Sequence, residues 1–157
     1  MANFQTAIQV LLQHEGGLVT DPNDSGGTTN FGICQRWNPG IDVKNLTQDD
    51  AENYYYTNWW KKYGLDKIND DDLACYVLDH GVNTGMAAVT CVVQQAIGAV
   101  VDGIMGPKTI ALINARYFPG MLSVIQTGLW VHYQKIIEDH PGDVKFRDGW
   151  YTRCFEL

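Results

Sequence analysis

The sequence has few basic residues and no continuous apolar segment. Lys and Arg number 11 against 18 Asp and Glu, which gives a formal net charge of −7 at pH 7. Because nucleic-acid phosphates are bound by clustered Lys and Arg, this balance argues against a nucleic-acid partner. Apolar residues are spaced along the chain and never form a run of about 20, the length that crosses a bilayer, so no stable membrane insertion is expected.

Residues 1–13 have neither a basic segment nor a small-residue cleavage site. A secretory signal peptide combines both features with an apolar stretch. We therefore expect the protein to be made in a cytoplasm without a signal peptide, with another factor providing release if it acts outside.

No two of the four cysteines form a Cys-x-x-Cys pair, so a zinc cluster is not expected. In a protein folded in a cytoplasm, reduced and mostly buried thiols are favoured over disulfides. The cysteines are Cys34, Cys75, Cys91 and Cys154.

The spacing of apolar residues is helical over most of the chain. It predicts helices at about 3–15, 47–62, 70–82, 87–97, 108–115 and 121–138, and a short helix or turn over 144–155. Residues 16–45 contain repeated turn signals, with at most a small β-hairpin near residues 18–33. A chain of 157 residues with 45% hydrophobic content can bury one core. We therefore predict a mainly α domain, or two small lobes that share a core.

One polar, glycine-rich segment, residues 14–33, cannot form part of a core. Glu15 occupies the last turn of the first predicted helix, and Gly16 and Gly17 end that helix. Glycines and small hydroxyl residues then dominate, as they do where backbone approaches a ligand. A simple helix cap followed by a turn remains the alternative interpretation.

Three common motifs are missing from this segment. His14-Glu15 is not followed by the second histidine of an HExxH zinc site, and Gly26-Gly27 does not lead into the lysine-bearing helix of a phosphate loop. The acidic residues of 21–24 lack the glycine and terminal glutamate spacing of an EF-hand. No metal site and no cofactor are predicted.

Two carboxylates in this segment have contrasting surroundings. Glu15 follows apolar helix residues, where desolvation favours a protonated acid, whereas Asp24 lies among Ser, Gly and Thr, which favour the charged form. Glycosidic bond cleavage uses such a pair, one carboxyl to protonate the leaving oxygen and one to activate water or support the transition state. Eight residues separate the two, and Thr29 is positioned to help hold a water.

These motifs resemble the signature of glycoside hydrolase family 108, the N-acetylmuramidases of phage and bacteria. The resemblance begins with Glu15-Gly16-Gly17 and continues over 21–33, the helix end at 55–60 and the segment 79–85. The later motifs at 94–98, 102–109 and 149–153 are similar to the peptidoglycan-binding region that usually follows in that family. The step from Asp24 to Thr29 is one residue shorter than in phage-type lysozymes, to which the segment is also similar.

The resemblance implies a lysozyme-like helical fold, with a catalytic region at 1–85 and a peptidoglycan-binding region at 86–157 packed on it as one unit. It implies a hydrolase of the β-1,4 bond between N-acetylmuramic acid and N-acetylglucosamine. We expect a phage endolysin or a prophage-derived lytic protein that acts as a monomer and, if encoded by a phage, reaches the cell wall with the help of a holin. Glu15 would be the general acid and Asp24 the base or stabiliser, with Thr29 near the water and no cofactor.

Two further residues, Trp60 and Asn83, are predicted as saccharide contacts, against core or capping roles for each. Two other functions remain open from the sequence. A lytic transglycosylase acts on the same bond with a lone acid, a mechanism that Asp24 disfavours. A non-catalytic wall-binding or secretion-related protein would retain the fold without the chemistry.

Overall fold

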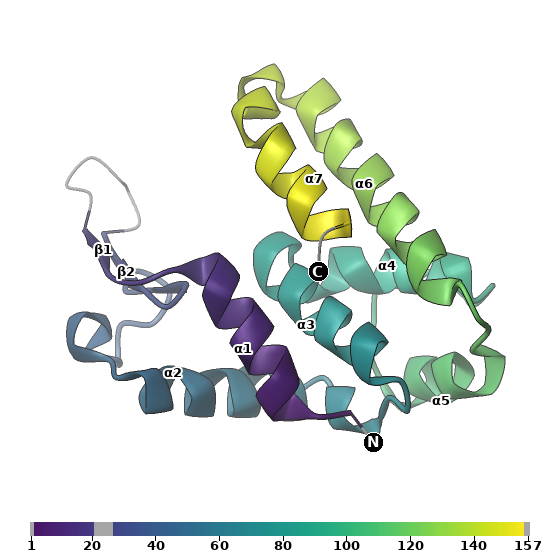
Figure 1. The fold of residues 1–157 in the computed structure, drawn as a ribbon, viewed down its shortest axis with the longest axis horizontal. Coiled ribbons are helices and arrows are strands. Elements are labelled where there is room, and N and C mark those ends of the chain that lie inside the picture. Colours follow the sequence, from purple (N-terminus) through teal and green to yellow (C-terminus); the bar gives the residue numbers. More distant parts are fainter. Residues whose placement is uncertain (1, 21–26, 156–157) are drawn as a thin grey trace.

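The computed structural model describes residues 2–20 and 27–155, and its architecture is mainly α, as predicted (Figure 1). The helices are α1 (Phe4–Glu15), α2 (Gln48–Tyr55), α3 (Asp71–Thr84), α4 (Met86–Ala96), α5 (Pro107–Arg116), α6 (Met121–Asp139) and α7 (Arg147–Phe155). Short 3₁₀-helices span Val43–Asn45, Leu65–Lys67 and Pro141–Phe146. None of the helices in these residues combines the length and the apolar character that crossing a membrane requires.

Helix starts follow the capping residues in the sequence. Asn3 caps α1 by accepting a hydrogen bond from a backbone amide of the first turn. Thr47 and Asp50 form a reciprocal capping box at α2, and Asp70 accepts the amide of Leu73 at the start of α3. Because these contacts satisfy amides that have no partner within the helix, local sequence is sufficient to place the boundaries.

The predicted hairpin is present and is extended by a third short strand. Strands β1 (Val19–Thr20), β2 (Thr28–Asn30) and β3 (Ile33–Cys34) pair antiparallel in that order. β2 and β3 are joined by two residues with positive φ, Phe31 at 51° and Gly32 at 75°. Two positive φ values at the centre of a two-residue loop define a type I′ turn, which matches the twist of the strands.

The helix predicted over 47–62 changes character part-way. After α2 the chain continues as a π-helix over Tyr56–Lys61. In this segment Tyr56 and Trp60 both contact the ring of Phe4 in α1, at centroid distances of 5.0 and 5.6 Å. The aromatic end of the predicted helix therefore closes one side of the core.

α3 lies at the centre of the molecule. It packs against α1 and α4, α4 packs against α6, and α7 lies beside α6. Figure 1 shows α7 returning along α6, so that the end of α7 lies near α3 and α1. This return places the last helix next to the end of the first, although they are separated by most of the chain.

A buried histidine of α3 fixes α7 in this position. The His80 ring lies 3.2 Å through Nε2 from the backbone oxygen of Arg153 and 3.2 Å through Nδ1 from the Tyr133 hydroxyl of α6. The Tyr76 hydroxyl donates to the backbone oxygen of Cys154. The last carbonyls of a helix lack partners within it, so α3 supplies the missing donors for α7. Since a carbonyl only accepts, Nε2 of His80 carries a hydrogen.

This histidine predicts a pH dependence of stability. Burial lowers the pKa of His80 from 6.5 to about 4, so the folded state keeps the ring neutral where the unfolded chain protonates it. The free energy of unfolding should therefore fall as pH drops from about 6.5 to about 4, by roughly 3 kcal/mol in total. Urea unfolding of the parent and of His80→Gln at a series of pH values measures this slope.

The variant should be less stable at neutral pH but show a flatter profile. Burial also lowers the pKa of His132, so part of the slope should remain. His140→Gln, at an exposed position beyond α6, is the control and should retain the full slope. If the pH dependence of the unfolding free energy is unchanged in His80→Gln, His80 is not its source.

Candidate active site

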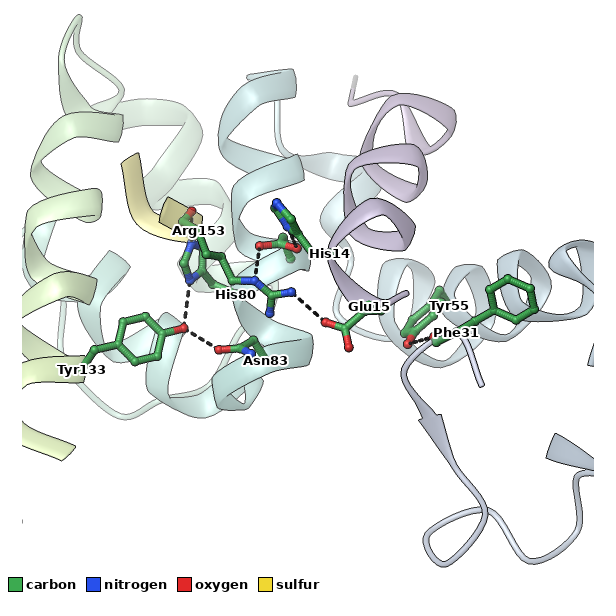
Figure 2. Close-up of polar contacts among 9 residues, drawn as sticks. His14, Glu15, Phe31, Tyr55, His80, Asn83, Tyr133 and Arg153 are labelled. Atoms are coloured by element: carbon green, nitrogen blue, oxygen red, sulfur yellow. Dashed lines mark hydrogen bonds and ion pairs between the residues drawn. The ribbon is translucent and has the colours of Figure 1, made fainter. Parts of the chain in front are cut away.

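Glu15 is the last residue of α1, and its side chain is 18% exposed. The chain leaves the helix at once because Gly16 has a φ of 68°. One carboxylate oxygen, Oε1, accepts a hydrogen bond from Nη2 of Arg153 at 2.9 Å. Figure 2 shows this arginine reaching from α7 to the end of α1. The acid predicted from sequence is therefore held in place by a cation from the opposite end of the chain.

The other carboxylate oxygen lies against the I′ turn. A Cβ atom built on Gly32 would come within 2.6 Å of Glu15 Oε2 and 2.8 Å of the Tyr55 hydroxyl. That hydroxyl donates to the backbone oxygen of Phe31 at 2.8 Å and so fixes the turn to α2. Burial and the nearby charge of Glu15 raise the pKa of Tyr55, which keeps the phenol a neutral donor. Oε2 is thus bordered by glycine backbone and one hydroxyl.

Arg153 is shared between two carboxylates. Its Nε lies 3.5 Å from Oδ2 of Asp79, a fully buried residue of α3, while Nη2 binds Glu15. Oδ1 of Asp79 in turn contacts Nδ1 of His14 at 2.9 Å. Arg153 therefore links the end of α1 to α3 and α7 through two ion pairs. The arrangement fixes the position of the Glu15 carboxylate.

Two buried polar atoms of this cluster have no hydrogen-bond partner among the described residues. They are Oδ2 of Asp79, which faces Arg153 beyond hydrogen-bond distance, and Nη1 of Arg153. Buried polar groups are nearly always satisfied by protein or ordered water. The unsatisfied Nη1 belongs to a residue that also lines a groove beside Glu15.

Hollows lie on both sides of Glu15. A groove of about 460 Å³ separates the end of α1 from α7 and the segment before it, and its lining residues are His14, Asn83, Lys145, Phe146, Gly149, Trp150, Thr152 and Arg153. We call it the α7 groove. A second hollow of about 430 Å³ adjoins it and shares Asn83, Phe146 and Trp150. A third, of about 350 Å³, is bordered by Gly16, Gly17 and Phe31. The residues on either side of Glu15 in the sequence therefore border hollows, although Glu15 is not among the lining residues of these three.

Of the other two residues predicted for catalysis, Thr29 lies in the sheet. Thr29 is half-buried in β2, where it pairs with Val19 and Cys34. Its neighbour Asn30 is buried and donates to the backbone of Val43, which ties β2 to the core. Side chains alternate along a strand, so Thr29 faces the opposite way. Asp24 lies outside the described residues, and its role stays a prediction, as does that of Thr29.

The two predicted saccharide contacts have different surroundings. Asn83 is exposed at the end of α3, accepts a hydrogen bond from the Tyr133 hydroxyl at 2.7 Å and borders both hollows along α7. Its predicted role stays open. The prediction for Trp60 is corrected, because its ring is 1% exposed and packs on Phe4. A ring without an exposed face cannot stack on a sugar, so Trp60 belongs to the core.

Sequence reasoning did not find the partners of Glu15. Arg153 and Asp79 stand in motifs that the family resemblance includes, but neither was connected to Glu15, from which they are separated by 138 and 64 positions. Tyr55 was likewise seen only as part of an aromatic helix end. One feature of the sequence could have indicated such a contact. Asp79 is a charged residue at a position of α3 where the apolar pattern predicts burial, and buried charges are usually paired.

No disulfide joins the four cysteines, all of which belong to the part of the chain that the structure describes. Among the same residues, no group of three or more His, Cys, Asp and Glu side chains is arranged to hold a metal ion.

The fold is similar to a solved one, the structure of SagA from Brucella abortus. The TM-score is 0.76 with 26% sequence identity, over 96% of this chain and 88% of that one. Residues 8–85, which include Glu15, Tyr55 and Asp79, match the family model described as Glycosyl hydrolase 108. No curated protein matches the chain. The likeness to SagA supports the fold, and the family-model match supports a glycoside hydrolase, the class that the sequence resemblance implies.

The contact between Gly32 and Glu15 predicts a strong effect of one methyl group. Gly32→Ala should push the Glu15 carboxylate out of place, because the new Cβ would meet Oε2 at 2.6 Å. Since misplacing a reacting group by about 1 Å costs on the order of 100-fold in rate, a loss of roughly that size is expected in wall hydrolysis.

Gly27→Ala provides a matched control. Gly27 also has a positive φ, 76°, but no atom lies within 4 Å of a Cβ built there. Both variants should lose about 1 kcal/mol of stability from backbone strain, and Gly32→Ala should lose more because its Cβ also crowds Glu15 and Tyr55; thermal unfolding measures both losses. Equal turnover in the two variants would show that Gly32 does not position Glu15.

Proposed function

We propose that this protein belongs to glycoside hydrolase family 108 and hydrolyses the β-1,4 bond between N-acetylmuramic acid and N-acetylglucosamine in peptidoglycan. The observation that carries the proposal is the environment of Glu15. Its Oε1 is bound by Arg153, its Oε2 borders the Gly32 turn, and its neighbours His14 and Gly16 line separate hollows. The match of residues 8–85 to the family model supports the same assignment.

In this proposal Glu15 protonates the leaving glycosidic oxygen through Oε2. Arg153 holds the carboxyl group by Oε1, so the group cannot rotate freely, and Oε2 beside the Gly32 turn is the oxygen left to carry the proton. As the proton leaves, the negative charge that develops on Glu15 is stabilised by the nearby Arg153 guanidinium. Asp79 contacts the same guanidinium, so the positive charge of Arg153 is shared between the two carboxylates. The group is therefore held in position before proton transfer, and its negative charge is stabilised afterwards.

The second carboxylate is Asp24, acting as base or electrostatic stabiliser, with Thr29 near the attacking water. We further propose release of a phage from its host as the biological role, with access to the wall supplied by a holin. The protein acts as a monomer on the wall polymer itself, and residues 86–157 act with the catalytic region as one unit. The contact of Arg153 with Glu15 supports this arrangement.

Mass spectrometry of digested peptidoglycan tests the reaction. A hydrolase releases muropeptides with reducing ends, each heavier by one water than the product of a lytic transglycosylase. Reducing N-acetylmuramic acid at the new ends is the expected result. Products that end in 1,6-anhydromuramic acid would contradict the hydrolase and indicate a lytic transglycosylase. An absence of soluble fragments would favour a non-catalytic wall-binding protein.

A further inference from the structure

The α7 groove differs in charge from the rest of the molecule. Acidic residues outnumber basic ones by 18 to 11 in the chain, yet Lys145 and Arg153 line the groove and no lining residue is acidic. By contrast, a hollow of about 390 Å³ at the opposite face of α1 is bordered by Asp49 and Glu52 without a cation. Arg153 is paired with Glu15 and Asp79, so among the described residues the uncompensated positive charge of the groove is that of Lys145, which can attract an anion.

The two cations of the groove differ in the part of the chain that the structure describes: Lys145 has no carboxylate partner, and Arg153, although paired with Glu15 and Asp79, keeps one unsatisfied N–H group. Within the described residues, no carboxylate lies at ion-pair distance from Lys145, whose Nζ is placed 4.8 Å from the centre of the Phe146 ring. Arg153 is about nine-tenths buried, and its Nη1 lacks a hydrogen-bond partner among these residues. One cation at the rim and one at the base therefore retain capacity for an anionic ligand.

The remaining wall suits a sugar. Trp150 stacks on Tyr133 with ring centroids 4.8 Å apart, and together with Phe146 it forms an apolar side of the groove. The exposed amide of Asn83, held through Oδ1 by the Tyr133 hydroxyl, lies where the two hollows along α7 meet. Apolar ring faces with a few fixed polar groups are typical of sites that orient a small ligand.

We propose that the α7 groove is the subsite that recognises the carboxylate of a muramyl unit next to the scissile bond. This inference rests on the proposed function, since it assigns the substrate side of the same site. A muramic acid residue carries a lactyl carboxyl group, which in the intact wall is extended by a peptide with carboxylates of its own. N-Acetylglucosamine has neither. The charge of the groove thus selects muramyl polymers over neutral chitin-like ones.

Calorimetric titration with soluble ligands tests the subsite. The ligands are the disaccharide of N-acetylglucosamine and N-acetylmuramic acid, the same disaccharide with its peptide, and neutral chitobiose. Lys145→Gln should weaken binding of the carboxylate ligands about fivefold and leave chitobiose unchanged. Lys145→Arg, which keeps the charge, should bind like the parent. Lys108→Gln, an exposed lysine of α5, is the control for loss of one charge.

The pattern of results separates the two sources of carboxylate. Weaker binding of both muramyl ligands assigns the lactyl group, and an effect confined to the peptide-bearing ligand assigns a peptide carboxylate. Equal changes for muramyl ligands and chitobiose, or no change at all, would overturn the subsite. Peptidoglycan turnover by the parent protein is measured in parallel. If the parent protein shows no turnover, the proposed hydrolase activity is wrong. The binding comparison would still show whether the α7 groove recognises a carboxylate.

Discussion

Glu15→Gln is expected to reduce peptidoglycan hydrolysis at least about 1,000-fold, the upper range for removal of a general acid. Glutamine has the same shape and can still accept the Arg153 hydrogen bond through Oε1, but it cannot donate a proton to a leaving oxygen. The fold should be preserved, because the contacts with Gly32 and Tyr55 involve the same volume. Release of reducing ends from purified peptidoglycan measures the effect.

A matched control separates chemistry from charge. Glu52→Gln makes the same change on α2, in a hollow with no catalytic contact, and should retain full activity. Both variants should show melting temperatures close to that of the parent. If Glu15→Gln clears cell walls as fast as the parent, Glu15 is not the proton donor and the proposed function loses its central residue.

Arg153→Met is expected to destabilise the protein by about 3–5 kcal/mol, the cost of leaving a buried charge without its partner. Asp79 is fully buried and would retain only His14, while Glu15 would lose its only ion-pair partner among the described residues. For a chain of this size the melting temperature should fall by about 10 °C. Hydrolysis should also drop roughly 100-fold, since Glu15 is no longer held in position. Thermal unfolding and turnover measure the two effects.

Two further variants test whether the stability loss of Arg153→Met comes from the unpaired Asp79 carboxylate. Arg116→Met removes an arginine that donates only to the backbone oxygens of Ile97 and Gly98, so it should cost about 1 kcal/mol and no activity. Adding Asp79→Asn to Arg153→Met should recover part of the lost stability, because the unpaired charge is then removed. A double variant with simply additive losses would show that Asp79 and Arg153 are not coupled.

Much of the fold could be predicted because its determinants are local. The start of α1 at Asn3, the capping box of Thr47 and Asp50, and the Asp70 cap each depend on residues within one turn. The position of Glu15 at the end of α1 follows from the glycines after it for the same reason. Apolar periodicity located the helices that bury one face, which accounts for the mainly α architecture.

Features that depend on contacts between distant elements were missed or misjudged. Trp60 was predicted as a sugar contact, but packing of α1 against the π-helix buries it. The I′ turn at Phe31 and Gly32 carries no Asn-Gly or Asp-Gly signal, and Tyr55 of α2 supports it instead. Periodicity shows that a side chain is buried, but not which side chain of another helix it meets.

The sequence by itself determined the helices, their caps and the place of a lone glutamate at a helix end, because each of these is decided within a few residues. Only the tertiary structure decided what surrounds that glutamate. The return of α7 along α6 brings Arg153 to Glu15 and Asp79, and Tyr76 and His80 hold the end of α7 by its carbonyl groups. Ion pairs and grooves of this kind form between elements far apart in the chain, where no local pattern specifies the partner.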